Sequence, residues 1–289
     1  MGLKSPIPLE QLQFNVPVPY KLHVDRELLD ITKQKLALDR FPEEQSDFGE
    51  RNWAQGATYD WDTQEKTLND AFNHFIVKLD VPGYGTLVLH YTHNPHLQQQ
   101  RNPSPPLSQP KDTKDPAFHV VAPSIPGFGF SPAPTKSGVG PNVVARTYKI
   151  LMTEVLRYPR FVTQGGDFGS FITRSLAIKY PEIVRAQHLN MFPLPPPTLF
   201  SAPAAYLRWC FSALTCSTFE QKALQVRWNF EQDQTGYLEQ QKTRPQTLGF
   251  ALGDSSVGLL AWFVEKVHDW AEVYDGFSDE DLITLAVMH

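Results

Sequence analysis

The sequence predicts an α/β fold in which helices flank a parallel sheet. Three observations lead to this prediction. Short apolar segments alternate with helical patterns between residues 117 and 191, a Gly-Gly-Asp-Phe-Gly turn joins one such segment to a helix, and the chain after residue 197 is helical in pattern. Alternation of strand and helix is typical of parallel sheets, whose connections cross over right-handedly.

The bulk composition excludes several classes of function. The 289 residues are 41% hydrophobic and 20% charged with a net charge of −5, so the chain lacks the basic stripe of a nucleic-acid-binding protein. No run of about 18 apolar residues predicts a membrane span. The first 20 residues hold no secretory apolar segment, so we expect a cytoplasmic protein.

The two cysteines, Cys210 and Cys216, do not have the spacing of a zinc site. Two buried thiols are the simpler interpretation, and a disulfide is left open.

Residues 1–93 form the first predicted region. Phe14–Tyr20 alternates with prolines and predicts an extended edge segment, and Asp25 is expected to cap a helix that runs to about Arg40. A polar and aromatic loop follows, and a second helical pattern covers residues 62–72.

A hairpin and a long loop come next. The segments Phe75–Leu79 and Thr86–Tyr91 flank the turn Pro82-Gly83-Tyr84-Gly85, which is typical of a β-hairpin. Residues 94–116 are rich in proline and glutamine with few aliphatic residues. They are predicted to be a disordered loop, because they bury too little apolar surface to offset the cost of ordering.

Residues 117–196 carry the alternation of strand and helix, and MFPLPPP at 191–197 marks the exit from the sheet. The expected elements, in order, are a strand over Ala117–Pro123, a helix over Asn142–Tyr158, a strand over Phe161–Gln164, a helix over Gly169–Tyr180 and a strand over Val184–Met191.

Residues 197–289 are predicted to form a helical region that the end of the chain cuts off. Ser217 and Glu220 make a capping-box pattern at the start of one helix. Asp254 or Ser255 opens a second helix, and Ser278 opens a third.

The turn at residues 165–169 carries the chemistry. A strand, a Gly-x-nucleophile-x-Gly turn and a helix form the nucleophile elbow of the α/β-hydrolase fold. Gly165 and Gly169 are expected to supply room for the turn, Asp167 occupies the nucleophile position, and the backbone N–H of Phe168 can donate to a developing oxyanion. The helix dipole favours an anion at this point.

An aspartate in this position demands different chemistry from a serine. A carboxylate is ionised at pH 7 without a base, and it suits attack on a strained or activated sp³ carbon, such as that of an epoxide or an alkyl halide. The product is an alkyl ester that water must cleave. The alternative is an ordinary helix cap, and the motif alone leaves both interpretations open.

The wider sequence resembles one family. HVVAPSIPGFGFS (119–131), VARTYKILMTEVLRYPRFVTQGGDFGSFITRSLAIKYPE (144–182) and HLNMFPLPPP (188–197) resemble the microsomal-type epoxide hydrolases of the α/β-hydrolase fold. FNVPVPYKLHVDRELLDITKQKLALDRFP resembles the meander that precedes that family's core, and residues 235–270 resemble its lid.

This resemblance implies roles for individual residues. Asp167 corresponds to the alkylating nucleophile, and Tyr237 to one of two lid tyrosines that polarise the epoxide oxygen and donate the proton as the ring opens. The implied partner is a small-molecule epoxide substrate, with no metal or organic cofactor. A homodimer is left open.

Several family features are missing from this sequence. The His-Gly-Trp-Pro motif and the strand before it are replaced by residues 94–116, and a helix near Tyr59–Trp61 is lacking. The second lid tyrosine, the charge-relay acid and the catalytic histidine have no counterpart. We expect none of His188, His268 and His289 to act as the base, with His188 packed in the sheet. The expected result is a chain impaired in turnover.

Two alternative functions remain open on the sequence. One is a catalytically inactive remnant that binds hydrophobic ligands. The other is a different enzyme with an aspartate nucleophile, such as a haloalkane dehalogenase, although the meander and Tyr237 speak against it.

Overall fold

The computed structural model describes residues 8–38, 59–94, 107–108, 110–112, 114–192, 197–212, 216–270 and 277–288. The chain forms two compact units, each described here by itself. The first comprises Met1–Met191 and Ser255–His289, and the second comprises Phe192–Asp254. Most of the predicted disordered loop over residues 94–116 lies outside the described residues, as does His289.

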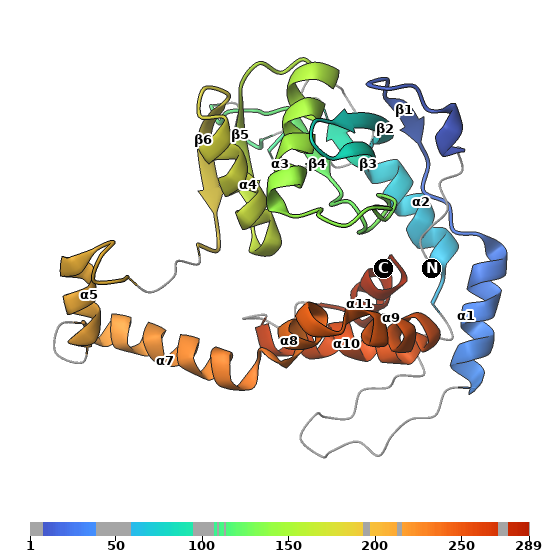
Figure 1. Ribbon diagram of the computed structural model, residues 1–289. Helices are drawn as coiled ribbons and strands as arrows, with labels where there is room; N and C mark the ends of the chain where they lie inside the picture. The colour runs from blue at the N-terminus through green and yellow to red at the C-terminus, as the bar shows by residue number, and fades with distance from the viewer. Residues whose placement is uncertain are drawn as a thin grey trace. The chain divides into compact units, whose positions relative to one another are not determined.

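The first sheet has four antiparallel strands in the order β1-β2-β3-β4 (Figure 1). These strands are β1 (Val18–Tyr20), β2 (His74–Val81), β3 (Gly85–Asn94) and β4 (Val120–Pro123). The predicted hairpin is confirmed, because β2 and β3 pair from His74 opposite Thr92 to Val81 opposite Gly85. Gly83 and Gly85 have φ angles of 78° and 114°, which only glycine adopts readily, so the tight turn requires them.

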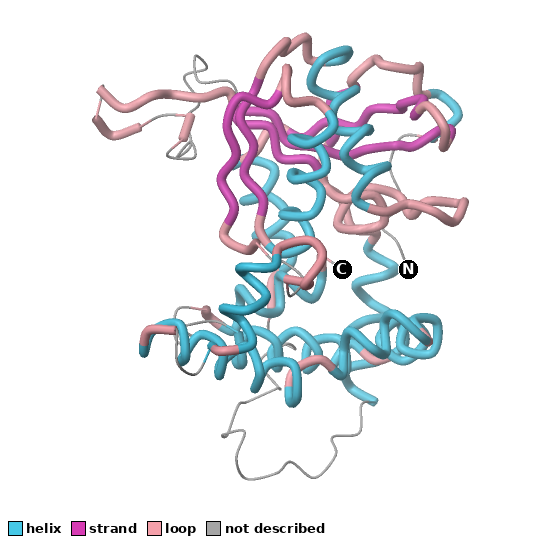
Figure 2. Tube along the Cα trace, turned by 60° about the vertical axis from the view of Figure 1, so that its left-hand side comes forward, coloured by secondary structure: helices cyan, strands magenta, loops and turns pink. Residues whose placement is uncertain are grey.

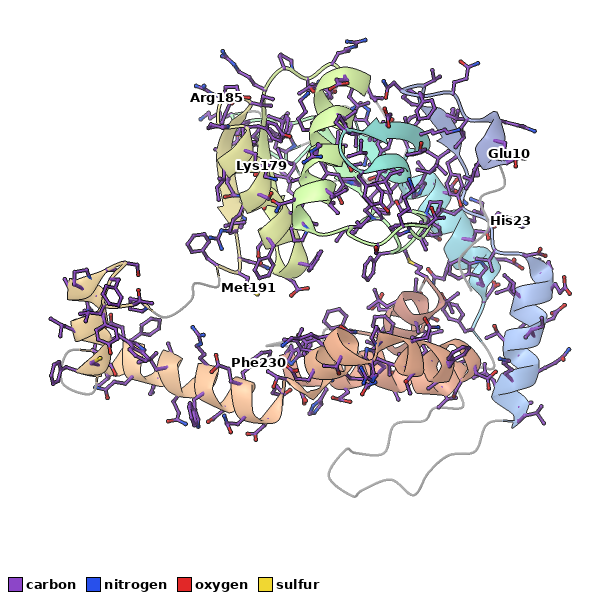
Figure 3. The ribbon with its side chains drawn as sticks, viewed as in Figure 1. Glu10, His23, Lys179, Arg185, Met191 and Phe230 are labelled. Atoms are coloured by element: carbon purple, nitrogen blue, oxygen red, sulfur yellow. The ribbon has the colours of Figure 1, made fainter. Side chains whose placement is uncertain are left out.

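The second sheet contains only β5 (Phe161–Gly165) and β6 (Val184–Leu189), which are parallel and joined through α4 (Asp167–Lys179). β4, which we expected to belong to the same parallel sheet, pairs antiparallel with β3 instead. Within the described ranges no ladder joins β4 to β5, so the two sheets are separate. Figure 3 labels Lys179 at the end of α4 and Arg185 on β6.

Helix α3 (Pro141–Ile150) connects the two sheets through its packing. It lies beside α4, as Figure 2 also shows, and its residues Val144 and Ala145 are buried against Ile172 and Leu176 of α4. Its last residue, Ile150, belongs to the core of the antiparallel sheet. Tyr148 packs against both cores, and its burial raises the pKa of its phenol far above the ordinary value.

The helix predicted over Asn142–Tyr158 is not continuous. After α3 the chain makes a π-helical turn over Leu151–Val155, in which the N–H of Leu156 donates to the carbonyl of Leu151 at 2.9 Å. Arg157 then adopts a φ of 61°, and this left-handed residue ends the helix in the manner usually reserved for glycine.

Two helices precede β2 along the chain. They are α1 (Arg26–Leu38) and α2 (Trp61–Ala71), preceded by the 3₁₀ turn Leu9–Gln11. The Asp25 carboxylate accepts from the N–H of Glu27 at 3.3 Å, as expected of a cap, and Asp60 caps α2. A second core beneath these elements contains Leu12, Tyr20, Leu22, Ile76 and Phe130.

The described residues of the second unit are largely helical, as predicted, and so are the described residues after it. Its helices are α5 (Pro203–Cys210), α7 (Thr218–Asp233), α8 (Gly236–Thr243) and α9 (Pro245–Asp254). The capping box of Ser217 and Glu220 is confirmed at the start of α7. Both cysteines are free thiols, and the expectation that both are buried is wrong, because Cys210 is exposed.

Two further helices, α10 (Ser256–Trp270) and α11 (Asp279–Val287), return to the first unit. Ser278 caps α11 in a second capping box with Asp281. No single helix of the described residues has the length and apolarity to cross a membrane. The bent pair α9 and α10 meets that test by length and composition alone.

Candidate active site

The elbow between β5 and α4 has the strained backbone of a nucleophile turn. β5 ends at Gly165, Gly166 is extended, and Asp167 begins the helix with a φ of 43°. Few residues with a side chain adopt this left-handed conformation, although aspartate tolerates it better than most. The observed strain is the kind of outlier from which a functional role is reasonably proposed.

Two glycines make the turn sterically feasible. A Cβ on Gly165 would lie 2.4 Å from the carbonyl oxygen of Gly169 and 2.6 Å from Thr173 Oγ1, and one on Gly166 would lie 2.6 Å from Asn190 Oδ1. A Cβ on Gly169 would meet nothing within 4 Å. The structure therefore corrects the expectation that Gly165 and Gly169 supply the room, because Gly165 and Gly166 do so.

The side chain of Asp167 does not cap its own helix. The N-cap position of α4 is Gly166, and no side chain makes a capping hydrogen bond there. Ser170 occupies the first turn instead, donating from Oγ to the backbone carbonyl of Asp167 at 2.6 Å. In the part of the chain that the structure describes, the Asp167 carboxylate is exposed and forms no hydrogen bond or ion pair. The helix-cap interpretation is therefore wrong.

Phe168 lies on the first turn of α4, where backbone N–H groups have no partner within the helix. Its ring is 43% exposed and packs at 6.3 Å from the ring of Phe171. The amide of Phe168 thus stands at the positive end of the helix dipole, beside the carboxylate. An amide in this position can donate to an anion. That the Phe168 amide does so in a reaction stays a prediction.

Tyr237 lies in the second compact unit, apart from the unit that contains Asp167. It is the second residue of α8 and is half-buried. Thr235, at the N-cap position, bonds back to the preceding helix, donating from Oγ1 to the carbonyl of Glu231 at 3.0 Å. The structure shows the local setting of Tyr237, and its role toward Asp167 stays a prediction.

Three histidines follow Asp167 in the sequence, and the structure describes two of them. His188 is exposed on β6, opposite Gln164, so the expectation that it packs in the sheet is wrong. His268 is also exposed, and its Nδ1 lies 2.8 Å from Oδ1 of the adjacent Asp269.

Asn190 also lies at this site, and the sequence analysis did not predict it. Its amide lies directly over Gly166, at the carboxyl end of β6. Polar residues at the carboxyl ends of parallel strands are a known signal of binding sites, and this rule could have drawn attention to Asn190. Among the described residues, no cluster of three or more His, Cys, Asp or Glu side chains could hold a metal ion.

Comparison with known families agrees with this geometry. The alpha/beta hydrolase fold family model matches residues 82–249, which include the elbow, and the model named epoxide hydrolase N terminus matches residues 17–108. The second match covers the predicted meander.

Relatives in sequence carry the same name. Epoxide hydrolase 1 of Sus scrofa is 29% identical over 80% of this chain and 58% of its own length. Juvenile hormone epoxide hydrolase 1 of Ctenocephalides felis is 30% identical over 73% of this chain and 49% of its own. The chain thus spans about half of the length of these relatives.

Solved structures give the same fold. The juvenile hormone epoxide hydrolase of Bombyx mori superimposes with a TM-score of 0.76 at 22% identity, covering 94% of this chain and 72% of that one. The epoxide hydrolase of Aspergillus niger gives a TM-score of 0.71 at 24% identity, covering 94% and 74%. The chain therefore belongs to the alpha/beta hydrolase fold family, and it carries the N-terminal region of the epoxide hydrolases.

Proposed function

We propose that Asp167 is the alkylating nucleophile of an epoxide hydrolase reaction. The observation that carries the proposal is an exposed carboxylate on a left-handed elbow residue, with no bonding partner among the described residues. A carboxylate with a structural role would bond to its own helix or to a cation. The epoxide hydrolase N-terminal region supplies the choice of electrophile.

The first step forms an ester. One oxygen of Asp167 attacks a carbon of the epoxide, the C–O bond of the ring breaks, and the electron pair stays on the epoxide oxygen. That alkoxide takes a proton, and Tyr237 is the donor that the family resemblance assigns. A phenol with a pKa of about 10 is a suitable acid for an emerging alkoxide.

The second step releases a vicinal diol. Water attacks the carboxyl carbon of the ester, and negative charge develops on the former carboxylate oxygen. The N–H of Phe168 would donate to that oxyanion. Losing one further donor of this kind costs about 10²–10³ in rate, and the chain contains no His-Gly-Trp-Pro sequence to supply it.

We infer that the described residues support ester formation better than ester hydrolysis. Ester formation requires a carboxylate and a proton donor, whereas hydrolysis also requires a base and a complete oxyanion hole. Neither described histidine after Asp167 has a setting that favours a base: His188 is exposed on β6, and His268 lies against the adjacent Asp269.

Intact-mass spectrometry after incubation with styrene oxide tests the proposal. We expect a gain of one substrate mass that is absent from Asp167→Asn. Because Cys210 is an exposed thiol and itself open to alkylation, both proteins should carry Cys210→Ser. Equal labelling of the two proteins would exclude Asp167 as the nucleophile. Steady release of diol would support the nucleophile and overturn the inferred weakness of the second step.

The alternative function is a catalytically inactive remnant that binds hydrophobic ligands. Reversible binding of styrene oxide, without any mass increase at Asp167, would favour it.

A further inference from the structure

A second polar cluster lies buried in the antiparallel sheet, in a region to which we assigned no chemistry. His74 on β2 and His90 on β3 are 7% and 3% exposed. Their rings stack with centroids 5.2 Å apart and planes at 25°, and Nδ1 of His74 lies 3.0 Å from Nε2 of His90. His90 Nδ1 in turn lies 2.8 Å from Ser124 Oγ, just after β4. We call His74, His90 and Ser124 the histidine relay.

The direction of every hydrogen bond in the relay follows from one end. His74 Nε2 lies 3.2 Å from the backbone carbonyl of Leu68, which can only accept, so this nitrogen carries the proton. Nδ1 of a neutral His74 must then accept, and Nε2 of His90 must donate to it. Nδ1 of His90 is left as an acceptor, and the hydroxyl of Ser124 donates to it.

A second set of bonds holds both ends of the loop Ser124–Ser131 to the same histidine. The backbone N–H of His90 donates to Ser131 Oγ at 2.9 Å, and the backbone carbonyl of His90 accepts from the N–H of Ser124 at 2.9 Å. Ser131 Oγ donates to the carbonyl of Ser124 at 3.0 Å and so closes the loop. His90 therefore bonds to Ser124 twice, through its ring and its carbonyl, and to Ser131 once, through its N–H.

The surroundings favour uncharged rings. Tyr20 of β1 and Phe130 of the loop face His90, with ring centroids at 5.5 and 5.2 Å. The carboxylate of Glu65, on α2, accepts hydrogen bonds from the N–H of Val24 and the indole of Trp61. Burial, with the charge of Glu65 as a second cause, raises the pKa of Tyr20. Met288, after α11, adds only apolar contact to this core.

Burial, with the neighbouring His74 as a second cause, lowers the pKa of His90 to about 3, and burial lowers that of His74. Both rings are accordingly neutral at physiological pH. An added proton on Nδ1 of His74 would set N–H against N–H, and one on Nδ1 of His90 would meet the hydroxyl hydrogen of Ser124. Either proton breaks the order of donors and acceptors.

The loop held in this way joins the two halves of the first unit. Phe130, near its end, belongs to the core beneath β1 and β2, whereas Ile125, next to Ser124, packs against the cluster that contains Ile172 and Leu176 of the elbow helix α4. We propose that the histidine relay is an acid-sensitive latch: it holds the loop Ser124–Ser131 between the antiparallel sheet and α4 while both rings are neutral, and it releases the loop when one is protonated. This proposal does not depend on the proposed catalytic function.

NMR of the full chain labelled with ¹⁵N-histidine tests the direction of the relay. Ring nitrogen shifts should show both His74 and His90 with the proton on Nε2, and both rings should stay neutral where an ordinary histidine, with a pKa of about 6.5, gains its charge. An Nδ1–H tautomer at either residue, or a charged ring near pH 6, would overturn the proposal.

Hydrogen exchange tests the latch itself. Replacing Ser124→Ala removes the donor to His90 Nδ1, so we expect at least about tenfold lower protection of the loop amides Gly127, Phe128 and Ser131, with unchanged protection in β2 and β3. Ser175→Ala also removes one serine hydroxyl that donates a hydrogen bond, here from α4 to Asn142 Oδ1 at 2.7 Å, so it is the matched control and should leave the loop unaffected. Unchanged loop protection in Ser124→Ala would contradict the latch.

If Ser124→Ala does not fold, the same amides are followed in the unaltered chain as the pH falls. The latch requires the loop to lose protection before β2 and β3 do. Simultaneous loss of protection in the loop, β2 and β3 would show that the relay does not hold the loop separately, and it would overturn the proposal.

Discussion

The backbone of Asp167 bears a conformational cost that its position on the elbow imposes. Its φ of 43° falls where glycine is at ease and other residues are strained. The chain keeps an aspartate there in spite of this cost. Selection for stability alone would favour glycine, so the aspartate agrees with the role that we propose for an exposed carboxylate.

Replacing Asp167→Gly should therefore raise the free energy of unfolding by about 0.5–1 kcal/mol while removing the nucleophile. Asp167→Asn is the control, because asparagine tolerates the same conformation and should change stability by less than about 0.5 kcal/mol. Urea denaturation measures both. A destabilised Asp167→Gly would show that the residue has a structural role.

The glycines of the elbow give a matched pair of substitutions. Gly165→Ala would force a Cβ to within 2.4 Å of the Gly169 carbonyl and should destabilise the protein by about 2–3 kcal/mol. Gly169→Ala meets no obstacle and should be neutral or stabilising by up to about 1 kcal/mol, because alanine favours helix. Thermal melts of the two variants compare them directly, and equal losses would refute the steric account.

At this scale the sequence identified Asp167 but not its surroundings. The spacing of glycines around an aspartate after a strand is a local signal, so the turn was predictable. The close approach of Asn190 to Gly166 joins residues on different strands, and only the parallel pairing of β5 with β6 brings them together.

At the scale of the elements, helix starts were predicted better than helix ends. Ser217 with Glu220 and Ser278 with Asp281 form capping boxes, whose code lies within four residues. The π-helical turn after α3 was missed. It depends on Arg157 in a left-handed conformation, which no local pattern requires, and on Leu151 being buried in the core.

The buried histidines of the β2–β3 hairpin predict a pH dependence of stability. The pKa values of His74, His90 and His93 are all lowered in the folded protein, chiefly by burial, so the unfolded chain, with histidine near 6.5, binds more protons. Their contribution to stability is complete above about pH 6.5 and is lost as the pH falls toward the folded values. For His90 alone the slope reaches about 1.4 kcal/mol per pH unit.

The window between about pH 4.5 and 6.5 isolates this effect in denaturation curves. The carboxylates with lowered pKa values, which are Asp60, Glu65, Glu220 and Asp281, lose their contribution only below their unfolded values of 3.8 to 4.5. A flat stability profile across the window would show that the hairpin histidines are not buried neutral.

At the scale of the whole molecule, the sequence predicted the fold class but not the break in the sheet. The strand and helix alternation predicted one parallel sheet, whereas β4 pairs with β3 and β5 pairs with β6 in a separate sheet. The separation of Phe192–Asp254 as a compact unit, with α10 and α11 returning to the first unit, was not predictable from helical periodicity. Periodicity identifies a buried face without identifying its partner.

The division into units sets what each part contributes to the proposed reaction. Asp167 and Phe168 belong to the first unit and need only the elbow to be in place, whereas Tyr237 belongs to the second. Ester formation at Asp167 is therefore the step that most directly tests whether this chain has the chemistry of its relatives.

Peptide mapping after incubation with styrene oxide makes that test. We predict that the adduct lies on the tryptic peptide Phe161–Arg174, as an ester at Asp167, and that Asp167→Asn lacks it. An unmodified peptide in a chain that is folded, or an adduct that persists on it in Asp167→Asn, would contradict the account.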